Sequence, residues 1–80
     1  MSPVIYREKK NKYYFFSREE SRIHIHVSSP NGEAKFWLEP IVALASSSNF
    51  TSKELNSIQK VVEKNCEKFK SEWKKFFKKL

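Results

Sequence analysis

The first half of the chain alternates between short apolar runs, rich in aromatic residues, and polar breaks. Four such runs occur, at residues 4–7, 12–16, 22–27 and 33–39. Residues 22–27 alternate with the period of two that is typical of a half-buried strand. Asn31-Gly32 precedes the last run, and this dipeptide favours a tight hairpin because both turn positions need a positive φ. The pattern predicts a four-stranded antiparallel β-meander over about residues 3–39.

The second half has a helical pattern. Apolar residues recur at steps of three and four, which predicts one long C-terminal helix over residues 52–79 with a single apolar stripe. Thr51 and Glu54 have the spacing of a capping box at its start. At 1.5 Å per residue the helix would be roughly 40 Å long, which exceeds the width of a domain of this size. Its last turns therefore either overhang and meet a partner, or the helix bends near Asn65.

These elements predict an α+β fold in which the helix packs on one face of the sheet, as a single domain over residues 1–80. Residues 40–50 are expected to connect the two parts. Within them, residues 41–45 fit either a short edge strand or an extended connection, and the pattern does not distinguish the two.

The register of the last hairpin follows if Asn31-Gly32 forms a two-residue turn. The expected opposite pairs are Ser28 with Lys35, Val27 with Phe36, His26 with Trp37, Ile25 with Leu38, and His24 with Glu39. The apolar members then fall on one face, which the helix is expected to cover. The other face stays open and carries Arg22, His24, His26, Lys35, Trp37 and Glu39.

Composition limits the class of protein. The 80 residues include 16 Lys and Arg against 9 Asp and Glu, a formal charge of +7, and the single cysteine excludes an internal disulfide. No stretch has the apolar length of a signal peptide or of a membrane span. We therefore expect a soluble domain located in the cytoplasm.

Several segments together resemble a known family. They are Pro3-Val4-Ile5, the aromatic strand at 12–16, His24-Ile25-His26-Val27, Gly32-Glu33-Ala34-Lys35-Phe36-Trp37-Leu38, and a helix that ends in Trp73. The chain resembles, over essentially its whole length, the small bacterial domain-of-unknown-function family numbered 4160. The resemblance implies a gene encoded beside a second small gene, in a toxin–antitoxin-like setting, and thus a cognate small protein as partner.

The two histidines allow a metal-binding hypothesis and a catalytic one. His24 and His26 point the same way on a strand, but a zinc site needs a third ligand. Cys66 belongs to the apolar helix stripe and Glu39 is one carboxylate, so we expect no metal and no cofactor. In the catalytic hypothesis Glu39 orients His24 as a general base. Arg22 and Lys35 then hold a phosphate, as metal-independent RNA cleavage requires. The competing interpretation is a cross-strand charge pair.

Trp37 is the large ring of the open face, flanked by Lys35 and, in this register, His26. Exposed rings among cations stack the bases of single-stranded nucleic acid, and they also anchor protein interfaces. A third interpretation is that the connection after the sheet folds over Trp37 and buries it.

The end of the helix is strongly basic. Six lysines and one glutamate lie in residues 68–80, and clustered lysine gives salt-dependent affinity for phosphate backbones. The residues expected to bind nucleic acid here are Lys74, Lys75, Lys78 and Lys79. Trp73, Phe76, Phe77 and Leu80 are expected to serve assembly, with a cognate protein or with a second copy of the chain. The same helix is amphipathic enough to lie on an anionic membrane surface.

The sequence thus predicts a component of a toxin–antitoxin-like module that binds RNA or DNA, a cognate small protein, or both. The alternative is a metal-independent ribonuclease toxin that uses His24 and Glu39.

Overall fold

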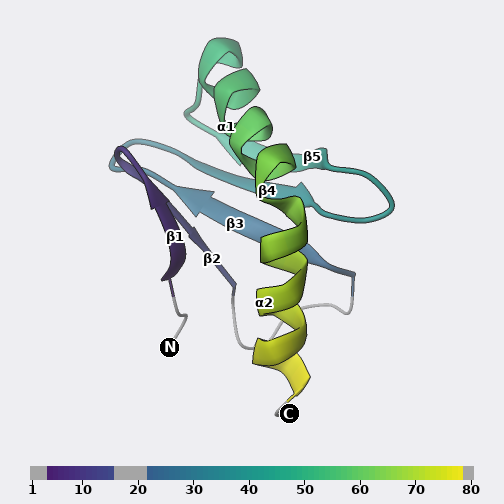
Figure 1. Ribbon diagram of the computed structural model, residues 1–80. Coiled ribbons are helices and arrows are strands. Elements are labelled where there is room, and N and C mark those ends of the chain that lie inside the picture. The colour runs from purple at the N-terminus through teal and green to yellow at the C-terminus, as the bar shows by residue number, and fades with distance from the viewer. Residues whose placement is uncertain (1–3, 16–21, 79–80) are drawn as a thin grey trace.

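The computed structural model describes residues 4–15 and 22–78, and it confirms an α+β fold with an antiparallel sheet followed by C-terminal helices. The elements are β1 (Val4–Glu8), β2 (Asn11–Tyr14), β3 (His24–Ser28), β4 (Glu33–Trp37), β5 (Ala43–Ser48), α1 (Ser52–Lys64) and α2 (Cys66–Lys78). The strands lie in the order β1-β2-β3-β4-β5, so each one pairs with its neighbour in the chain. Figure 1 shows α2 passing in front of the strands, with α1 continuing beyond its upper end.

The sheet has five strands among the described residues, where the sequence pattern predicted four. The segment expected to be a connection, residues 40–50, contains β5, which pairs with β4. An irregularity between Lys35 and Phe36 shifts the register of this pair. The alternation of β5 is hard to recognise because it ends in three exposed serines, Ser46 to Ser48, which carry no apolar signal.

The hairpin between β3 and β4 has a longer loop than predicted. Ser28 opposes Glu33, so four residues rather than two make the turn. The Ser29 hydroxyl accepts hydrogen bonds from the backbone N–H groups of Asn31 (3.3 Å) and Gly32 (3.1 Å). A serine side chain that satisfies its own loop in this way competes with the two-residue turn. The predicted register is therefore wrong by two residues, although every residue keeps its face of the sheet.

Gly32 is required at the end of this loop by a close approach. A Cβ atom at this position would lie 3.0 Å from the carbonyl oxygens of Ser48 and Asn49, and 3.1 Å from the Phe50 ring. The loop thus packs directly against the segment that leaves β5.

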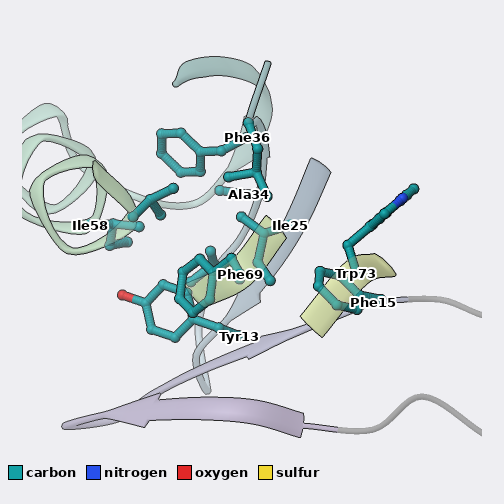
Figure 2. Close-up of a cluster of buried hydrophobic side chains, with 11 residues drawn as sticks. Tyr13, Phe15, Ile25, Ala34, Phe36, Ile58, Phe69 and Trp73 are labelled. Carbon is teal, nitrogen blue, oxygen red and sulfur yellow. The ribbon is translucent and has the colours of Figure 1, made fainter. Parts of the chain in front are cut away.

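The core lies between the sheet and the helices, on the face where the alternation predicted it (Figure 2). Its buried members come from β2, β3 and β4, from the residues directly after β2 and β4, and from both helices: Tyr13, Phe15, Ile25, Val27, Ala34, Phe36, Leu38, Ile58, Val62, Phe69 and Trp73. The three rings of Tyr6, Tyr13 and Phe69 contact one another at centroid separations of 5.5–5.9 Å. Each fully buried large side chain contributes roughly 1.5–3 kcal/mol through removal of apolar surface from water.

The predicted single helix is divided at Asn65. The capping box is present as expected, with the Thr51 hydroxyl accepting from the Glu54 N–H and the Glu54 carboxylate from the Thr51 N–H. At Asn65 the side-chain amide donates to the Val61 carbonyl (2.8 Å), and the backbone leaves the helical region at φ −105° and ψ 15°. Of the two alternatives for an overlong helix, the bend near Asn65 is the one observed.

The bend changes what the end of the helix contacts. Phe76 and Phe77, expected to lack a partner within one copy of the chain, instead lie 6.0 and 6.3 Å from the Phe15 ring, measured between centroids. Phe77 also lies 4.1 Å from Trp73. The argument that these rings must be used for assembly is therefore lost, because they pack on their own core. Leu80 and Lys79, and the side chain of Lys78, lie outside the described residues.

Neither α1 nor α2 has the length and apolar content that crossing a membrane demands, within the part of the chain that the structure describes.

Candidate functional site

The face of the sheet opposite the helices carries polar and aromatic side chains. Ile25 and Phe36 are buried against the helices, so their strand neighbours point the other way, because side chains alternate along a strand. We define the open face by the half-buried neighbours His26, Lys35 and Trp37, by Tyr14, which pairs with His26, and by Arg22. The four strand residues are half-buried and the arginine is exposed.

Two cations lie over the indole of Trp37. The guanidinium carbon of Arg22 is 4.2 Å from the ring centroid, and the Lys35 ammonium is 4.6 Å from it. The guanidinium also donates hydrogen bonds to the Glu39 carbonyl at 3.3–3.4 Å. Each cation–π contact at a site of this exposure contributes about 0.5–1 kcal/mol. The indole thus holds two positive charges close together on an accessible surface.

Tyr14 and His26 continue this surface toward β2. Their rings stack at a centroid separation of 5.6 Å, as the pairing of Tyr14 with His26 across the strands requires. Beside them is a shallow hollow of about 270 Å³, which Lys35 and the serines of β5 also line. The hollow therefore combines ring faces, a cation and hydroxyl groups, with the acidic residue Glu33 also in its lining.

His24 is not an exposed member of the open face, contrary to the prediction. It opposes Trp37 rather than Glu39, and its side chain is fully buried. Its Nδ1 lies 2.7 Å from the Arg22 carbonyl oxygen, and since a carbonyl only accepts, Nδ1–H is the donor. The His24 ring also lies 5.0 Å from Trp73 of α2 and 5.8 Å from Trp37. His24 therefore joins the open face to the end of the helix.

Glu39 does not pair with His24, so the proposed catalytic pair is not formed. The carboxylate lies 3.7 Å from the Lys70 ammonium of α2, and half of the Glu39 side chain remains exposed. The physical reason is the loop length described above. The two-residue shift places Trp37 opposite His24 and leaves Glu39 beyond the end of β4.

The basic residues of α2 lie near the same end of the sheet. Lys70 contacts Glu39, and Lys74 follows one helical turn later on the same side, since residues four apart share a helix face. Lys74 and Lys75 are exposed, with Lys75 3.8 Å from the Glu72 carboxylate. Lys70 therefore lies near Glu39, whose backbone carbonyl also accepts hydrogen bonds from Arg22 of the open face. Lys78 and Lys79 cannot be placed for the reason given above.

No group of three His, Cys, Asp or Glu side chains that could hold a metal ion occurs among residues 4–15 and 22–78. Cys66 lies on the helix side of the sheet, with its Sγ 3.8 Å from the Leu38 carbonyl oxygen. Burial raises the pKa of the Cys66 thiol, and the nearby Lys70 partly opposes this rise. The thiol is therefore a protonated packing group at neutral pH.

Sequence reasoning missed Tyr14 and the serines of β5 as members of this surface. Tyr14 belonged to a predicted strand, but the pairing of this strand with the next one could not be derived from the sequence. Without that register, the face of the sheet on which Tyr14 lies stayed undetermined. The serines were missed with their strand. The pairing of Tyr14 with His26 is the observation that places the ring on the open face.

Comparison with known proteins gives one match. No curated protein and no solved structure matches the chain. The family model described as Domain of unknown function (DUF4160) matches residues 12–74, a span from the start of β2 to the second half of α2. Because this match covers most of the chain, the protein belongs to the DUF4160 family of domains of unknown function.

Proposed function

We propose that this protein is the nucleic-acid-binding component of a small toxin–antitoxin-like module and that it binds single-stranded nucleic acid on its open face. The observation that carries the proposal is Trp37 with two cations held over its ring, at 4.2 and 4.6 Å from the ring centroid. A phosphate-rich, base-bearing polymer needs both kinds of group at once. The cations neutralise phosphates, and ring faces stack bases.

The phosphate contacts are assigned to Arg22 and Lys35. Arg22 is exposed, and its guanidinium is oriented by the Glu39 carbonyl, so less side-chain freedom is lost when it binds an anion. Lys35 reaches both the Trp37 ring and the hollow beside Tyr14. A nucleic-acid strand bound to these two residues would run from the end of β4 to the middle of the sheet.

The bases are assigned to the ring surfaces beside that path. Sheets that bind single strands use aromatic rings on an uncovered face in this way. The stacked pair of Tyr14 and His26 provides one ring surface, and the serine hydroxyls of β5 provide hydrogen-bonding groups next to it. Duplex cannot present its bases to a shallow hollow, so the proposal commits to single strands.

The lysines of α2 extend the surface. Lys74 and Lys75 are exposed, and Trp73 anchors this part of α2 against His24. Four phosphate contacts, from two sheet residues and two helix residues, imply a log–log salt slope near −3 for single strands, at about 0.7 per contact.

The ribonuclease alternative is not favoured by any observation. It needs a carboxylate that orients an accessible imidazole, whereas Glu39 pairs with Lys70 and His24 is buried between rings. A cognate protein as the occupant of the open face remains the competing hypothesis, and the experiment below separates the two.

The test measures the binding of a fluorescently labelled single-stranded RNA at two salt concentrations. The double variant Arg22→Ala/Lys35→Ala should bind about tenfold more weakly or worse, because two phosphate contacts are lost. The matched control is Lys60→Ala/Lys64→Ala, which removes the same charge from the exposed side of α1. Equal losses of RNA affinity in both variants would mean that binding depends on the net charge of the protein and not on the open face. Absence of RNA binding at low salt, together with capture of the protein encoded by the adjacent gene, would replace the proposal with a protein interface.

A further inference from the structure

β5 lies at one edge of the sheet, so its backbone has a neighbouring strand on only one side among the described residues. In Figure 1 it borders the sheet on the side away from β1. With six residues it is the longest described strand, and Ser46, Ser47 and Ser48 are all exposed. The outer N–H and C=O groups of such a strand are a template on which another strand can pair.

The segment around β5 is the longest uncharged run of a strongly basic chain. Residues 40–52 contain no charged side chain, although the whole chain has a formal charge of +7. Natural proteins commonly protect a sheet edge from pairing by placing charged residues on it, above all lysine. β1, at the opposite edge, follows this rule, because it contains Arg7 and Glu8 and is followed by Lys9. β5 has no protection of this kind.

Apolar side chains are exposed beside the same edge. Leu44 in β5 is 42% exposed, and Ile41, which shortly precedes the strand, is 71% exposed. Among the described residues, the other large apolar side chain with comparable exposure is Val4 of β1, at 41%. A strand added to β5 would cover part of Leu44 and so remove apolar surface from water.

The irregularity within β5 changes which of its residues share a face. Leu44 and Ser47 oppose the buried residues Phe36 and Ala34 of β4, so both lie on the helix side of the sheet, because opposite residues share a face. They are three residues apart. Side chains of a regular strand alternate, so only the extra residue of the irregularity permits this odd spacing.

This spacing makes β5 complementary to an antiparallel copy of itself. When two copies pair over all six residues, Leu44 opposes Ser47 of the second copy, and both lie on the helix side. Ala43 opposes Ser48 of the second copy, and both lie on the open side, since they pair with the outward-facing residues of β4. A regular six-residue strand paired in this way would set residues of opposite faces against each other.

From these observations we infer that β5 is a dimerisation edge, on which a second copy of this chain pairs antiparallel around a two-fold axis perpendicular to the sheet. The occupant is a second copy because an identical strand matches the faces of β5. Two copies that each carry +7 also meet with least repulsion at an uncharged segment. Such an axis keeps the same face up in both copies, so the two sheets continue as one and their open faces adjoin.

This edge differs from the end of α2, which the sequence pattern assigned to assembly, and the inference stands whether or not the open face binds nucleic acid. The dimer is expected to be weak. One pair of six-residue strands buries less than the roughly 800 Å² per partner that is typical of a stable interface. Association should therefore depend visibly on protein concentration.

The first experiment is sedimentation velocity of the protein without nucleic acid, at concentrations from about 10 µM to 1 mM, the range in which a small interface associates. We expect the sedimentation coefficient to rise from that of a monomer toward that of a dimer. A monomer at every concentration would overturn the inference. If such a monomer instead binds the protein encoded by the adjacent gene through β5, that protein replaces the second copy as the occupant.

The second experiment compares Leu44→Lys with Val4→Lys, which add the same charge at equally exposed apolar positions on the two edge strands. Leu44→Lys should weaken dimerisation about tenfold or more, because it places a lysine on the pairing edge. Val4→Lys should leave dimerisation nearly unchanged. Circular dichroism melting curves establish that both variants fold. Equal weakening by the two substitutions would assign the effect to net charge and contradict pairing through β5.

The third experiment tests the register by cross-linking. Copies that carry Leu44→Cys and copies that carry Ser47→Cys are mixed under mild oxidation, both in a Cys66→Ser background. The mixed disulfide should exceed either disulfide between like copies, because opposite Cβ atoms of an antiparallel pair lie only about 4.5–5.5 Å apart. Equal yields of all three products would contradict the centred antiparallel pairing.

Discussion

The predicted and observed registers differ by two residues, and this difference has unlike consequences on the two faces of the sheet. On the helix face, a shift of two residues replaces one apolar partner by another, so Ile25 meets Phe36 instead of Leu38 and the core is unchanged in kind. On the open face, the same shift replaces Glu39 by Trp37 as the partner of His24 and removes a hypothetical catalytic pair. Burial depends on which face a residue occupies, whereas chemistry depends on which residue stands opposite.

The largest expected effect compares neighbouring residues on the two faces. Phe36→Ala should lower the free energy of unfolding by about 3–5 kcal/mol, because it leaves a cavity in the core. Lys35→Ala, one residue away, should cost clearly less, about 1 kcal/mol, the size of its cation–π contact with Trp37. Urea unfolding monitored by circular dichroism measures both. Similar losses in the two variants would mean that the faces are not as unequal as their burial indicates.

His24 was predicted to lie exposed on the open face, but it is buried. We therefore expect it to contribute to stability. His24→Ala should destabilise the fold by about 1–3 kcal/mol, since it removes a hydrogen bond and contacts to two tryptophans. His26→Ala, on the same strand and half-buried, should cost clearly less. Thermal unfolding of the two variants decides the matter. A His24→Ala protein as stable as the original would return His24 to the accessible surface.

Alkaline unfolding should report on the buried tyrosine of the helix face. Burial raises the pKa of Tyr13 from 10 to about 12, so its stabilising contribution is complete below pH 10. Between pH 10 and 12 the unfolded chain loses its proton first, and stability should fall by about 1–2 kcal/mol. Tyr6, whose pKa its hydrogen bond to Glu8 raises, adds a loss of the same sign. Denaturant titrations at pH 9 and 11.5 should show this decline, and Tyr13→Phe should reduce it. An identical decline in that variant would assign the titration elsewhere.

The smallest effect concerns how far the open face extends onto α2. Replacing Lys74 and Lys75 by Glu should flatten the log–log salt slope of single-strand binding by about 1.4, at about 0.7 for each lost contact. The matched change at Lys60 and Lys64 should leave the slope nearly unaltered. Fluorescence anisotropy over a range of salt concentrations gives both slopes. If the α1 variant flattens the slope equally, the helix end has no special part in binding.

The fold was predictable where short-range pattern decides the structure. The capping box at Thr51 and the alternation of β3 depend only on neighbouring residues, and both are observed. The fifth strand was foreseen only as one of two alternatives for residues 41–45, since its serines have no apolar pattern to distinguish a strand from a connection. The division at Asn65 was foreseen only as one of two alternatives, because propensity does not tell whether an asparagine side chain will bond back to the preceding turn.

The candidate site was less predictable than the fold. Trp37 and Lys35 were placed on the correct face by alternation, but the approach of Arg22 to the indole and the burial of His24 depend on tertiary contacts. Because the loop has four residues instead of two, His24 opposes Trp37 and does not pair with Glu39. A hairpin dipeptide such as Asn31-Gly32 therefore indicates a turn more securely than it indicates which residues face one another.

The order of elements along the chain determines how long the apolar face of the sheet stays exposed during synthesis. Among the described residues all five strands precede both helices, so the sheet leaves the ribosome while the segment that covers its apolar face is still being translated. Until Phe69 and Trp73 arrive, Tyr13, Ile25 and Phe36 have no cover from α2. A chain truncated before α2 would have a sheet with an exposed apolar face, and chaperones and proteases recognise such surfaces. The apolar face of the sheet is therefore covered only after α2 has been synthesised.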